Sequence, residues 1–366
     1  MRIMLITDAW EPQVNGVVRT MKRVIAECEA MGHEWEVVSP ADGFFTVPLP
    51  TYSEIKLAIG ARRAIAKRFD DFEPDAVHIA TEGTLGMAGR AVCLKEKHPF
   101  TTSYHTRFPE YVSARFPVPV SWGYSFVHWF HKYSGKVMVA TPSMREELEA
   151  QNFINVVSWT RGVDTDLFDP NKRIEEGEDR DPFAGLPRPI FLNVGRVAVE
   201  KNIEAFLKLD LPGSKVVVGD GPQLEELKKK YPGATFLGAM FGDDLATCFA
   251  SADVFVFPSL TDTFGLVILE AMATGTPVAA YDAPGPKDII PGSDAGMISD
   301  DLGAAAVACL DLDRAVCRTY AEGYSWRACA EAFIENLEPL PAPERKRFWQ
   351  KIRLRRRKQR DEVSSF

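Results

Sequence analysis

Short apolar segments alternate with segments of helical periodicity along most of the chain, and this alternation limits the possible folds more than any other feature. Buried strands are predicted at residues 1–7, 34–39 and 75–79, with helices at 17–31 and 54–72. Strands that alternate with helices form parallel sheets with helices on both faces. The first part of the chain is therefore expected to be a doubly wound α/β domain.

The same alternation starts again near Pro189. The predicted strands there are 190–194, 215–219, 234–237, 254–257 and 277–281, with helices beginning at Asn202 and Gln223. A chain of 366 residues also exceeds what one hydrophobic core usually supports. We therefore expect two Rossmann-like domains that face each other across a cleft at the carboxyl ends of their strands.

Composition suggests where these domains begin and end. Residues 169–189 are acidic, rich in glycine and proline, and lack apolar periodicity, which indicates a linker. The N-terminal domain is then predicted at 1–168 and the C-terminal domain at 190–322. A C-terminal helix is expected within 323–340, followed by a basic tail at 341–366.

The net charge of −8 is distributed unevenly. The tail contains ten Lys or Arg and three acidic residues, so the rest of the chain carries −15, which argues against a general nucleic-acid binder. On a helix, Phe348, Trp349 and Ile352 would share one face flanked by arginines, a pattern typical of attachment to anionic membranes. A disordered, solvated tail is the alternative.

The cysteines and the N-terminus indicate the cellular compartment. The six cysteines are scattered without a C-x-x-C motif, which favours reduced thiols over disulfides or a zinc site. The N-terminus does not resemble a signal peptide, and no apolar run approaches the roughly 18 residues of a membrane span. The sequence therefore predicts a cytoplasmic protein.

Two cations are expected at the mouth of the second sheet. Arg196 and Lys201 lie in a segment that follows a predicted strand and opens a helix. Two permanent cations beside unpaired helix amides can bind a diphosphate. Taken alone, the two residues could equally be solvated surface charges.

Two further junctions contain glycine where the backbone must turn tightly or approach a ligand. One is Val218-Gly219-Asp220-Gly221-Pro222, and the other is the loop before Val17 that contains Gly16. Gly16 could admit a phosphate or could be an ordinary turn glycine. The dinucleotide pattern G-x-G-x-x-G is absent from the N-terminal loop, which disfavours a nicotinamide enzyme.

An acid pair stands in residues 258–278, where Asp262 precedes a predicted helix and Glu270 lies about two turns inside it. No basic residue lies near either acid in the sequence. The carboxylates could accept hydrogen bonds from hydroxylated rings, while Gly265 lets the first-turn amides approach a ligand. Alternatively, Asp262 is a helix cap and Glu270 a buried acid that the backbone satisfies.

In this order along the chain, the Gly-Arg–Lys segment, the Gly-Asp-Gly turn and the acid pair closely resemble glycosyltransferase family 4, which has the GT-B architecture. The resemblance runs from Met1 to about Leu337. Asp262 and Glu270 match the family's E-x7-E motif, with Asp in place of the first Glu. The shorter Asp reaches one methylene less far toward the sugar.

The resemblance implies a role for each matching donor residue. Asp262 and the amides of Phe264, Gly265 and Leu266 would hold the donor sugar, and Glu270 the nucleotide ribose. Arg196, Lys201 and Gly16 would hold the diphosphate. It further implies a retaining reaction in which the leaving phosphate accepts the acceptor's proton, and a C-terminal helix that crosses back to the N-terminal domain.

On the acceptor side, the resemblance matches His105 to the family's active-site histidine. Read alone, a histidine at the end of a strand is more often structural. Glu82 also follows a predicted strand and is assigned to the acceptor. Trp122 and Trp129 belong to an aromatic-rich helix that could contact the acceptor or could simply fill the core.

No metal or cofactor is expected. Asp164 and Asp166 have the D-x-D spacing that can hold Mn²⁺ or Mg²⁺ on a diphosphate, but the resemblance places them in a structural loop. Arg196 and Lys201 would supply the neutralising charge instead.

The predicted activity is transfer of a hexose or hexuronic acid from a nucleotide diphosphate sugar, with UDP as the expected nucleotide, to a membrane lipid such as diacylglycerol. UDP is chosen because the chain resembles bacterial lipid glycosyltransferases more than mannosyl enzymes. The alternatives are a polysaccharide or lipopolysaccharide acceptor, a sugar-nucleotide epimerase of the same architecture, and a non-enzymatic basic adaptor. We expect the protein to lie on the inner face of the cell membrane.

Overall fold

The computed structural model describes residues 1–13, 15–49, 52–113, 118–292 and 294–363. Contacts between Cα atoms divide the chain into two compact units. The first unit contains residues 1–139, 147–159 and 330–366, and the second contains 140–146 and 160–329. Each unit is an α/β fold with its own parallel sheet, as the sequence predicted.

Six parallel strands form the sheet of the first unit. In spatial order they are β2 (Glu34–Val38), β1 (Arg2–Ile6), β5 (Ala76–Ile79), β6 (Thr101–Tyr104), β7 (Val137–Val139) and β8 (Val156–Ser158). Strand β1 pairs on one side with β2, where Ile3 lies opposite Trp35, and on the other with β5, where Ile3 lies opposite Ala76. The chain therefore winds in opposite directions from β1 and β5.

The first unit also contains helices, several of which pack on the two faces of this sheet. They are α1 (Gly16–Ala30), α2 (Arg62–Phe72), α3 (Thr84–Glu96), α4 (Phe108–Ser113), α5 (Val120–His131), α6 (Pro142–Ala150), α14 (Trp326–Asn336) and α15 (Ala342–Val363), with α6 and α14 each shared between the two units. Met4 and Ile6 face a core that includes Phe69 of α2 and Val92 of α3. Alternation along β1 sends Ile3 and Leu5 to the opposite face.

A short antiparallel hairpin corrects one prediction. Residues 54–72 were expected to form one helix, but β4 (Tyr52–Ala58) pairs with β3 (Thr46–Leu49), and only α2 is helical. Gly60 separates the two elements with a φ of +71°, a conformation that glycine adopts without strain. Backbone pairing with β3 therefore overrides the helical periodicity of this segment.

The second sheet has the strand order of a dinucleotide-type doubly wound domain. Its parallel strands are β11 (Thr235–Gly238), β10 (Ser214–Val218), β9 (Ile190–Val194), β12 (Val254–Phe257), β13 (Val278–Ala280) and β14 (Gly296–Ile298). Phe191 of β9 lies opposite Lys215 of β10 on one side and Val254 of β12 on the other. The order reverses between β9 and β12, which is where ligands of such sheets bind.

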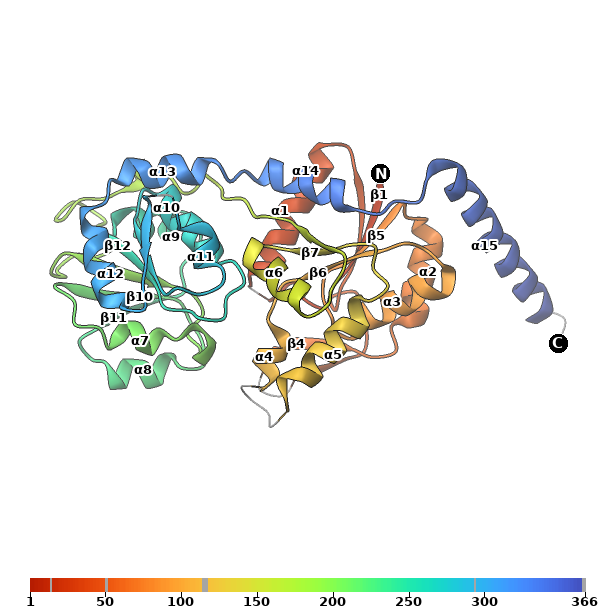
Figure 1. Ribbon diagram of the computed structural model, residues 1–366, viewed down its shortest axis with the longest axis horizontal. Coiled ribbons are helices and arrows are strands. Elements are labelled where there is room, and N and C mark those ends of the chain that lie inside the picture. The colour runs from red at the N-terminus through yellow and green to blue at the C-terminus, as the bar shows by residue number, and fades with distance from the viewer. Residues whose placement is uncertain (14, 50–51, 114–117, 293, 364–366) are drawn as a thin grey trace. The chain divides into compact units, whose positions relative to one another are not determined.

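Two layers of helices cover the second sheet, with α7 and α8 on one side and α9, α10 and α13 on the other (Figure 1). The helical segments are η1 (Pro170–Lys172), η2 (Val199–Lys201), α7 (Ile203–Leu207), α8 (Leu224–Lys230), α9 (Gly242–Ser251), α10 (Leu266–Ala273), α11 (Pro286–Ile289), α12 (Leu302–Ala308), η3 (Cys309–Asp311) and α13 (Arg314–Glu322). Here η marks a 3₁₀ helix. Successive residues of β9 point to opposite faces, so Phe191 and Leu192 belong to two different cores.

The segments before β9 and after α13 belong to different units. Residues 169–189, predicted as a linker, cluster with the second unit, where Phe183 is buried in the same core as Phe255. Residues 330–366 cluster with the first unit, where Phe333 of α14 stacks on Trp35 and packs against Trp159.

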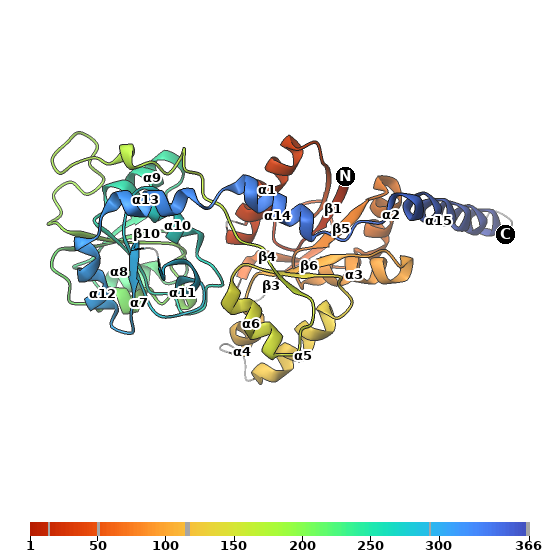
Figure 2. The same cartoon turned by 45° about the horizontal axis from the view of Figure 1, so that its top comes forward.

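The basic tail forms helix α15, which starts beside α2 in both views (Figures 1 and 2). Trp349 and Ile352 are each 5% exposed and belong to the core of the first unit. Phe69 of α2 lies 5.0 Å from Trp349 between ring centroids. The expectation that this apolar face meets a membrane is therefore wrong, because the first unit already covers it. Burial of the Ile352 side chain alone contributes roughly 1.5–3 kcal/mol to docking of the tail.

Ion pairs fix the same helix to the first unit. Arg345 pairs with Asp75, and Arg353 pairs with Glu73. Arg355 and Arg356 both pair with Glu96, whose side chain is 1% exposed. Part of the positive charge of the tail thus neutralises acids of the first unit.

Candidate active site

Two loops of the second unit meet beside the point where its strand order reverses. One follows β9 and contains Gly195, Arg196 and Lys201, and the other follows β12 and contains Asp262. The Asn202 side chain donates to the carbonyl oxygen of Pro258 over 3.1 Å. The hydroxyl of Thr261 donates to the carbonyl oxygen of Glu200 over 3.1 Å. These bonds tie the two loops together.

Lys201 and Asp262, predicted separately, form an ion pair in the structure. Lys201 Nζ lies 2.6 Å from Asp262 Oδ1, and the two side chains are 31% and 22% exposed. The second carboxylate oxygen, Oδ2 of Asp262, is buried and accepts no hydrogen bond from the described residues. A diphosphate at this position would compete with Asp262 for the ammonium group of Lys201.

The Gly219–Gly221 turn supports the loop that carries Arg196. Gly195 N donates to the carbonyl oxygen of Val218, and Val197 N donates to that of Asp220, over 3.0 and 2.9 Å. A Cβ atom at residue 219 would lie 1.8 Å from the carbonyl oxygen of Gly195. The two backbones therefore approach so closely that this position requires glycine. Arg196 lies half-buried in the supported loop.

Helix α10 begins slightly later than the sequence predicted. Its first residue is Leu266, and Gly265 precedes it with a φ of +92°. Glu270 is therefore about one turn inside the helix rather than two, and it is 3% exposed. Phe264 is also buried, at 6% exposed. Asp262, Gly265 and the first amides of α10 are thus close in the chain, at the carboxyl edge of the sheet.

In the first unit, Gly16 is the first residue of α1, and the helix cap is Asn15. Its Oδ1 accepts hydrogen bonds from Val17 N and Val18 N, both over 3.0 Å. The Asn15 side chain in turn donates to Gln13. The first amides of α1 are therefore already capped, and the sequence analysis assigned no role to Asn15, although Asn is a favoured capping residue.

Asp8, which the sequence analysis did not single out, organises the edge of this sheet. It follows β1, and its carboxylate accepts hydrogen bonds from Leu85 N and Gly86 N at the start of α3, over 2.8 and 3.2 Å. Burial raises the pKa of Asp8, although these amides oppose the shift. An acid directly after a buried first strand was the available signal.

Glu82, predicted to contact the acceptor, and His105, predicted as the active-site histidine, follow β5 and β6, which are neighbouring parallel strands. Both residues therefore lie at the same edge as Gly16. The Glu82 carboxylate lies 3.2 Å from Nε2 of His131, a buried histidine that the sequence analysis missed. The ring of His105 packs 5.9 Å from that of Trp159, measured between centroids.

Trp122 and Trp129 lie on the surface of α5, at 69% and 47% exposed. The alternative that these two aromatic side chains fill the core is therefore wrong. Trp129 is covered on one side by the guanidinium of Arg90, 4.3 Å from a ring centroid. The exposed parts of both tryptophan rings can contact a ligand or a membrane surface.

No group of three or more His, Cys, Asp or Glu side chains in the described part of the chain could hold a metal ion. Asp164, from the D-x-D motif, accepts a hydrogen bond from Leu167 N over 3.0 Å and so shapes its own turn. Among the described residues, no helix is long and apolar enough to cross a membrane. The six cysteines are all buried, and burial raises the pKa of Cys93 to about 12.

Comparison with known proteins identifies the class. Residues 14–167 match the family model described as Glycosyltransferase Family 4, and residues 188–313 match that described as Glycosyl transferases group 1. A UDP-glucose complex of Anabaena Alr3699/HepE aligns with a TM-score of 0.69 at 14% identity, over 92% of this chain and 98% of that one. These matches and the two parallel sheets define a GT-B glycosyltransferase.

Three curated relatives show which glycosyltransferases are similar in sequence to this chain. A GDP-mannose-dependent alpha-mannosyltransferase of Mycobacterium tuberculosis is 31% identical over 81% of this chain and 83% of its own length. The sulfoquinovosyl transferase SQD2 of Arabidopsis thaliana is 32% identical over 76% of this chain and 59% of its own length. The alpha-monoglucosyldiacylglycerol synthase of Streptococcus pneumoniae is 26% identical over 78% and 72%. The chain belongs to glycosyltransferase family 4.

UDP was expected because the chain resembles bacterial lipid glycosyltransferases more than mannosyl enzymes. This premise is wrong, since a GDP-mannose-dependent enzyme is more similar to this chain, at 31% identity, than the glucosyldiacylglycerol synthase is, at 26%.

The close approach of two backbones generates the first prediction. Gly219→Ala should lower the free energy of unfolding by about 1–3 kcal/mol, because the added methyl group would overlap the carbonyl oxygen of Gly195. Gly233→Ala is the matched control, since a Cβ there meets nothing within 4 Å. Urea unfolding followed by circular dichroism measures both, and equal midpoints would contradict the proposed contact.

Proposed function

We propose that this glycosyltransferase transfers a hexose, with retention of configuration, from a UDP- or GDP-linked sugar to a membrane lipid such as diacylglycerol, without a metal ion. The observation that carries the proposal is the meeting of Lys201, Asp262 and the start of α10 beside the strand reversal of the second sheet. Relatives whose names specify a GDP sugar or a glucosyldiacylglycerol product support the donor and acceptor classes.

In the proposed reaction, the bond between the anomeric carbon and the diphosphate breaks while the acceptor oxygen bonds to that carbon. The acceptor's proton passes to an oxygen of the departing diphosphate. Arg196, Lys201 and the amides at the start of α10 stabilise the charge that develops on the leaving group. Asp262 accepts hydrogen bonds from the sugar, and Glu270 from the ribose.

The ion pair gives Lys201 a second task in this scheme. Before the donor binds, Asp262 satisfies the ammonium group, which limits the cost of keeping it partly buried. When a diphosphate takes over Lys201, the Asp262 carboxylate becomes available to the hydroxyls of the sugar. The same exchange would place phosphate and sugar on adjacent side chains.

The acceptor lies in the first unit in this proposal. Glu82 and His105 lie at the carboxyl edge of its sheet, and the buried His131 contacts the Glu82 carboxylate. Trp122 and Trp129 on α5 offer exposed aromatic rings of the kind that settle at a membrane interface. We assign His105 to the reacting sugar and Glu82 to the acceptor hydroxyl.

Loss of the donor contacts should reduce transfer strongly. Lys201→Ala and Glu270→Gln each remove a charged hydrogen bond worth about 1.5–3 kcal/mol, which corresponds to roughly a 10- to 150-fold lower kcat/KM. The assay combines purified protein, diacylglycerol in mixed micelles, and UDP-glucose or GDP-mannose in parallel. Lys208→Ala is the control, because Lys208 is exposed and pairs with Glu204, away from the candidate site. Unchanged rates in both site variants would refute the assignment.

Activity should persist in excess EDTA. Arg196 and Lys201 carry the positive charge that a divalent ion would otherwise bring to the diphosphate. The measurement compares initial rates with and without EDTA, and then after addition of Mg²⁺ or Mn²⁺. Complete loss with EDTA that either ion restores would return Asp164 and Asp166 to the site.

The outer face of α15 should bind anionic membranes electrostatically. Lys346, Arg347 and Lys351 are exposed, whereas the apolar face of the helix is buried. Each cation near an anionic surface contributes about 1 kcal/mol, so reversing all three to Glu should weaken binding by at least a hundredfold.

The matched control reverses Lys208, Lys228 and Lys229 of the second unit, which are equally exposed. Sedimentation with phosphatidylglycerol vesicles measures both variants against the unmodified chain. Truncation before α15 is avoided because it would uncover the core around Phe69. Equal binding by the two triple variants would remove the tail from the membrane interface.

A further inference from the structure

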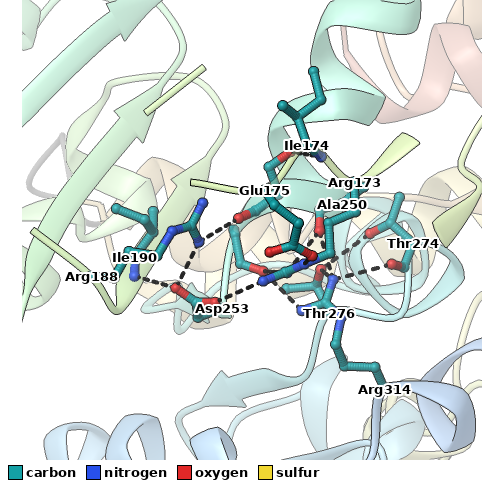
Figure 3. A network of polar contacts seen from close by, with 12 residues as sticks. Arg173, Ile174, Glu175, Arg188, Ile190, Ala250, Asp253, Thr274, Thr276 and Arg314 are labelled. Carbon is teal, nitrogen blue, oxygen red and sulfur yellow. Dashed lines mark hydrogen bonds and ion pairs between the residues drawn. The ribbon is translucent and has the colours of Figure 1, made fainter. Parts of the chain in front are cut away.

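Three arginines converge in the second unit (Figure 3). They lie at the amino-terminal edge of its sheet, whereas the loops that contain Lys201 and Asp262 follow the carboxyl ends of β9 and β12. Arg173 and Arg188 lie in the segment that leads into β9, and Arg314 starts α13. Asp253, the residue before β12, accepts from Arg188 Nη1 over 3.0 Å and from Arg173 Nη2 over 3.4 Å. The loops that contain Lys201 and Asp262 are therefore one strand length from Asp253.

Arg173 and Arg314 bind the same pair of backbone oxygens at the end of α9. Arg314 donates to the carbonyl oxygens of Ala250 and Ala252 over 2.7 and 2.9 Å, and Arg173 donates to both over 3.2 Å. The two guanidinium groups are therefore held close to each other. Burial, and then the charge of Arg173, lower the pKa of Arg314 to about 10.

Negative charge in this cluster does not match the positive charge. Three arginines face one half-buried carboxylate, Asp253, and Glu175, whose side chain is 63% exposed and so contributes little. Helix carbonyls carry only partial charge. Nη2 of Arg188 donates to no acceptor among the described residues, but it is shielded from solvent and so does not itself face the cavity. The cluster can therefore accommodate a further anion.

The arginines border a cavity of about 420 Å³, within the usual range for small-molecule sites. Asp253 also lines the cavity, and the remaining wall is apolar and consists of Pro189, Pro277, Leu310 and Leu312. Guanidinium groups match phosphate oxygens bidentately, whereas prolines and leucines suit a carbon skeleton. The lining thus combines three cations and one carboxylate with four apolar residues.

We propose that this cavity, lined by Arg173, Arg188 and Arg314, binds a phosphorylated small molecule, with its phosphate on the arginines and its carbon skeleton on the proline and leucine wall. This site is separate from the donor site and does not depend on the proposed transfer reaction. Fastening the end of α9 is a structural task that one of these arginines could perform. That task does not explain the excess positive charge or the adjoining cavity, whereas a bound phosphorylated ligand explains both.

Isothermal titration of the full-length chain with phenyl phosphate tests the proposal, with phenol as the uncharged probe. The unmodified chain should bind phenyl phosphate and not phenol. Leu310→Glu places a carboxylate on the cavity wall and should weaken binding at least tenfold. Leu310 is 36% exposed, so this change should leave the fold intact.

Three controls separate the possible outcomes. Leu310→Gln has the same shape without the charge, and Val307→Glu adds the charge at an exposed position of α12 outside the cavity, so both should bind within twofold of the unmodified chain. Lys201→Ala should also bind normally, because it alters only the donor site. Absence of binding to the unmodified chain, normal binding by Leu310→Glu, or loss of binding in Lys201→Ala would each overturn the proposal.

Discussion

The pairing of β9 with β10 on one side and β12 on the other is the constraint on which the second unit depends. It places the start of two loops side by side, so that Lys201 and Asp262 can form an ion pair although they are far apart in the chain. The same pairing aligns the other ends of the strands, where Arg188 and Asp253 meet. One strand arrangement therefore positions both the candidate donor site and the arginine cluster.

The sequence predicted the fold well because doubly wound domains depend on local patterns. The strand at 190–194 and the second start of the alternation near Pro189 were read from short apolar runs, and both agree with the structure. The helix predicted at 54–72 was wrong over residues 54–58, which form a strand, because pairing of β4 with β3 is a non-local interaction. The apolar face of α15 was recognised, but its partner was not, since periodicity shows that a face is apolar and not what covers it.

The sequence could propose Lys201, Asp262 and Glu270 for the candidate site because each residue type suits a direct chemical task. The candidate site could not be predicted where a residue acts through another. Asp8 holds the start of α3, Asn15 caps α1, and His131 fixes Glu82, and each depends on contacts between segments far apart in the chain or on a helix boundary. The pairing of Lys201 with Asp262 likewise appears only once the two loops are placed on neighbouring strands.

The two faces of α15 imply different responses to ionic strength. Trp349 and Ile352 hold the helix to the first unit through apolar burial, which salt does not screen, although salt does weaken the ion pairs that add to this attachment. The exposed cations act through long-range attraction, which falls off within a Debye length of about 8 Å at physiological ionic strength. If the chain binds an anionic surface as proposed, concentrated salt would release it while apolar burial keeps its last helix on the domain, so that adsorption would be reversible without any change of structure.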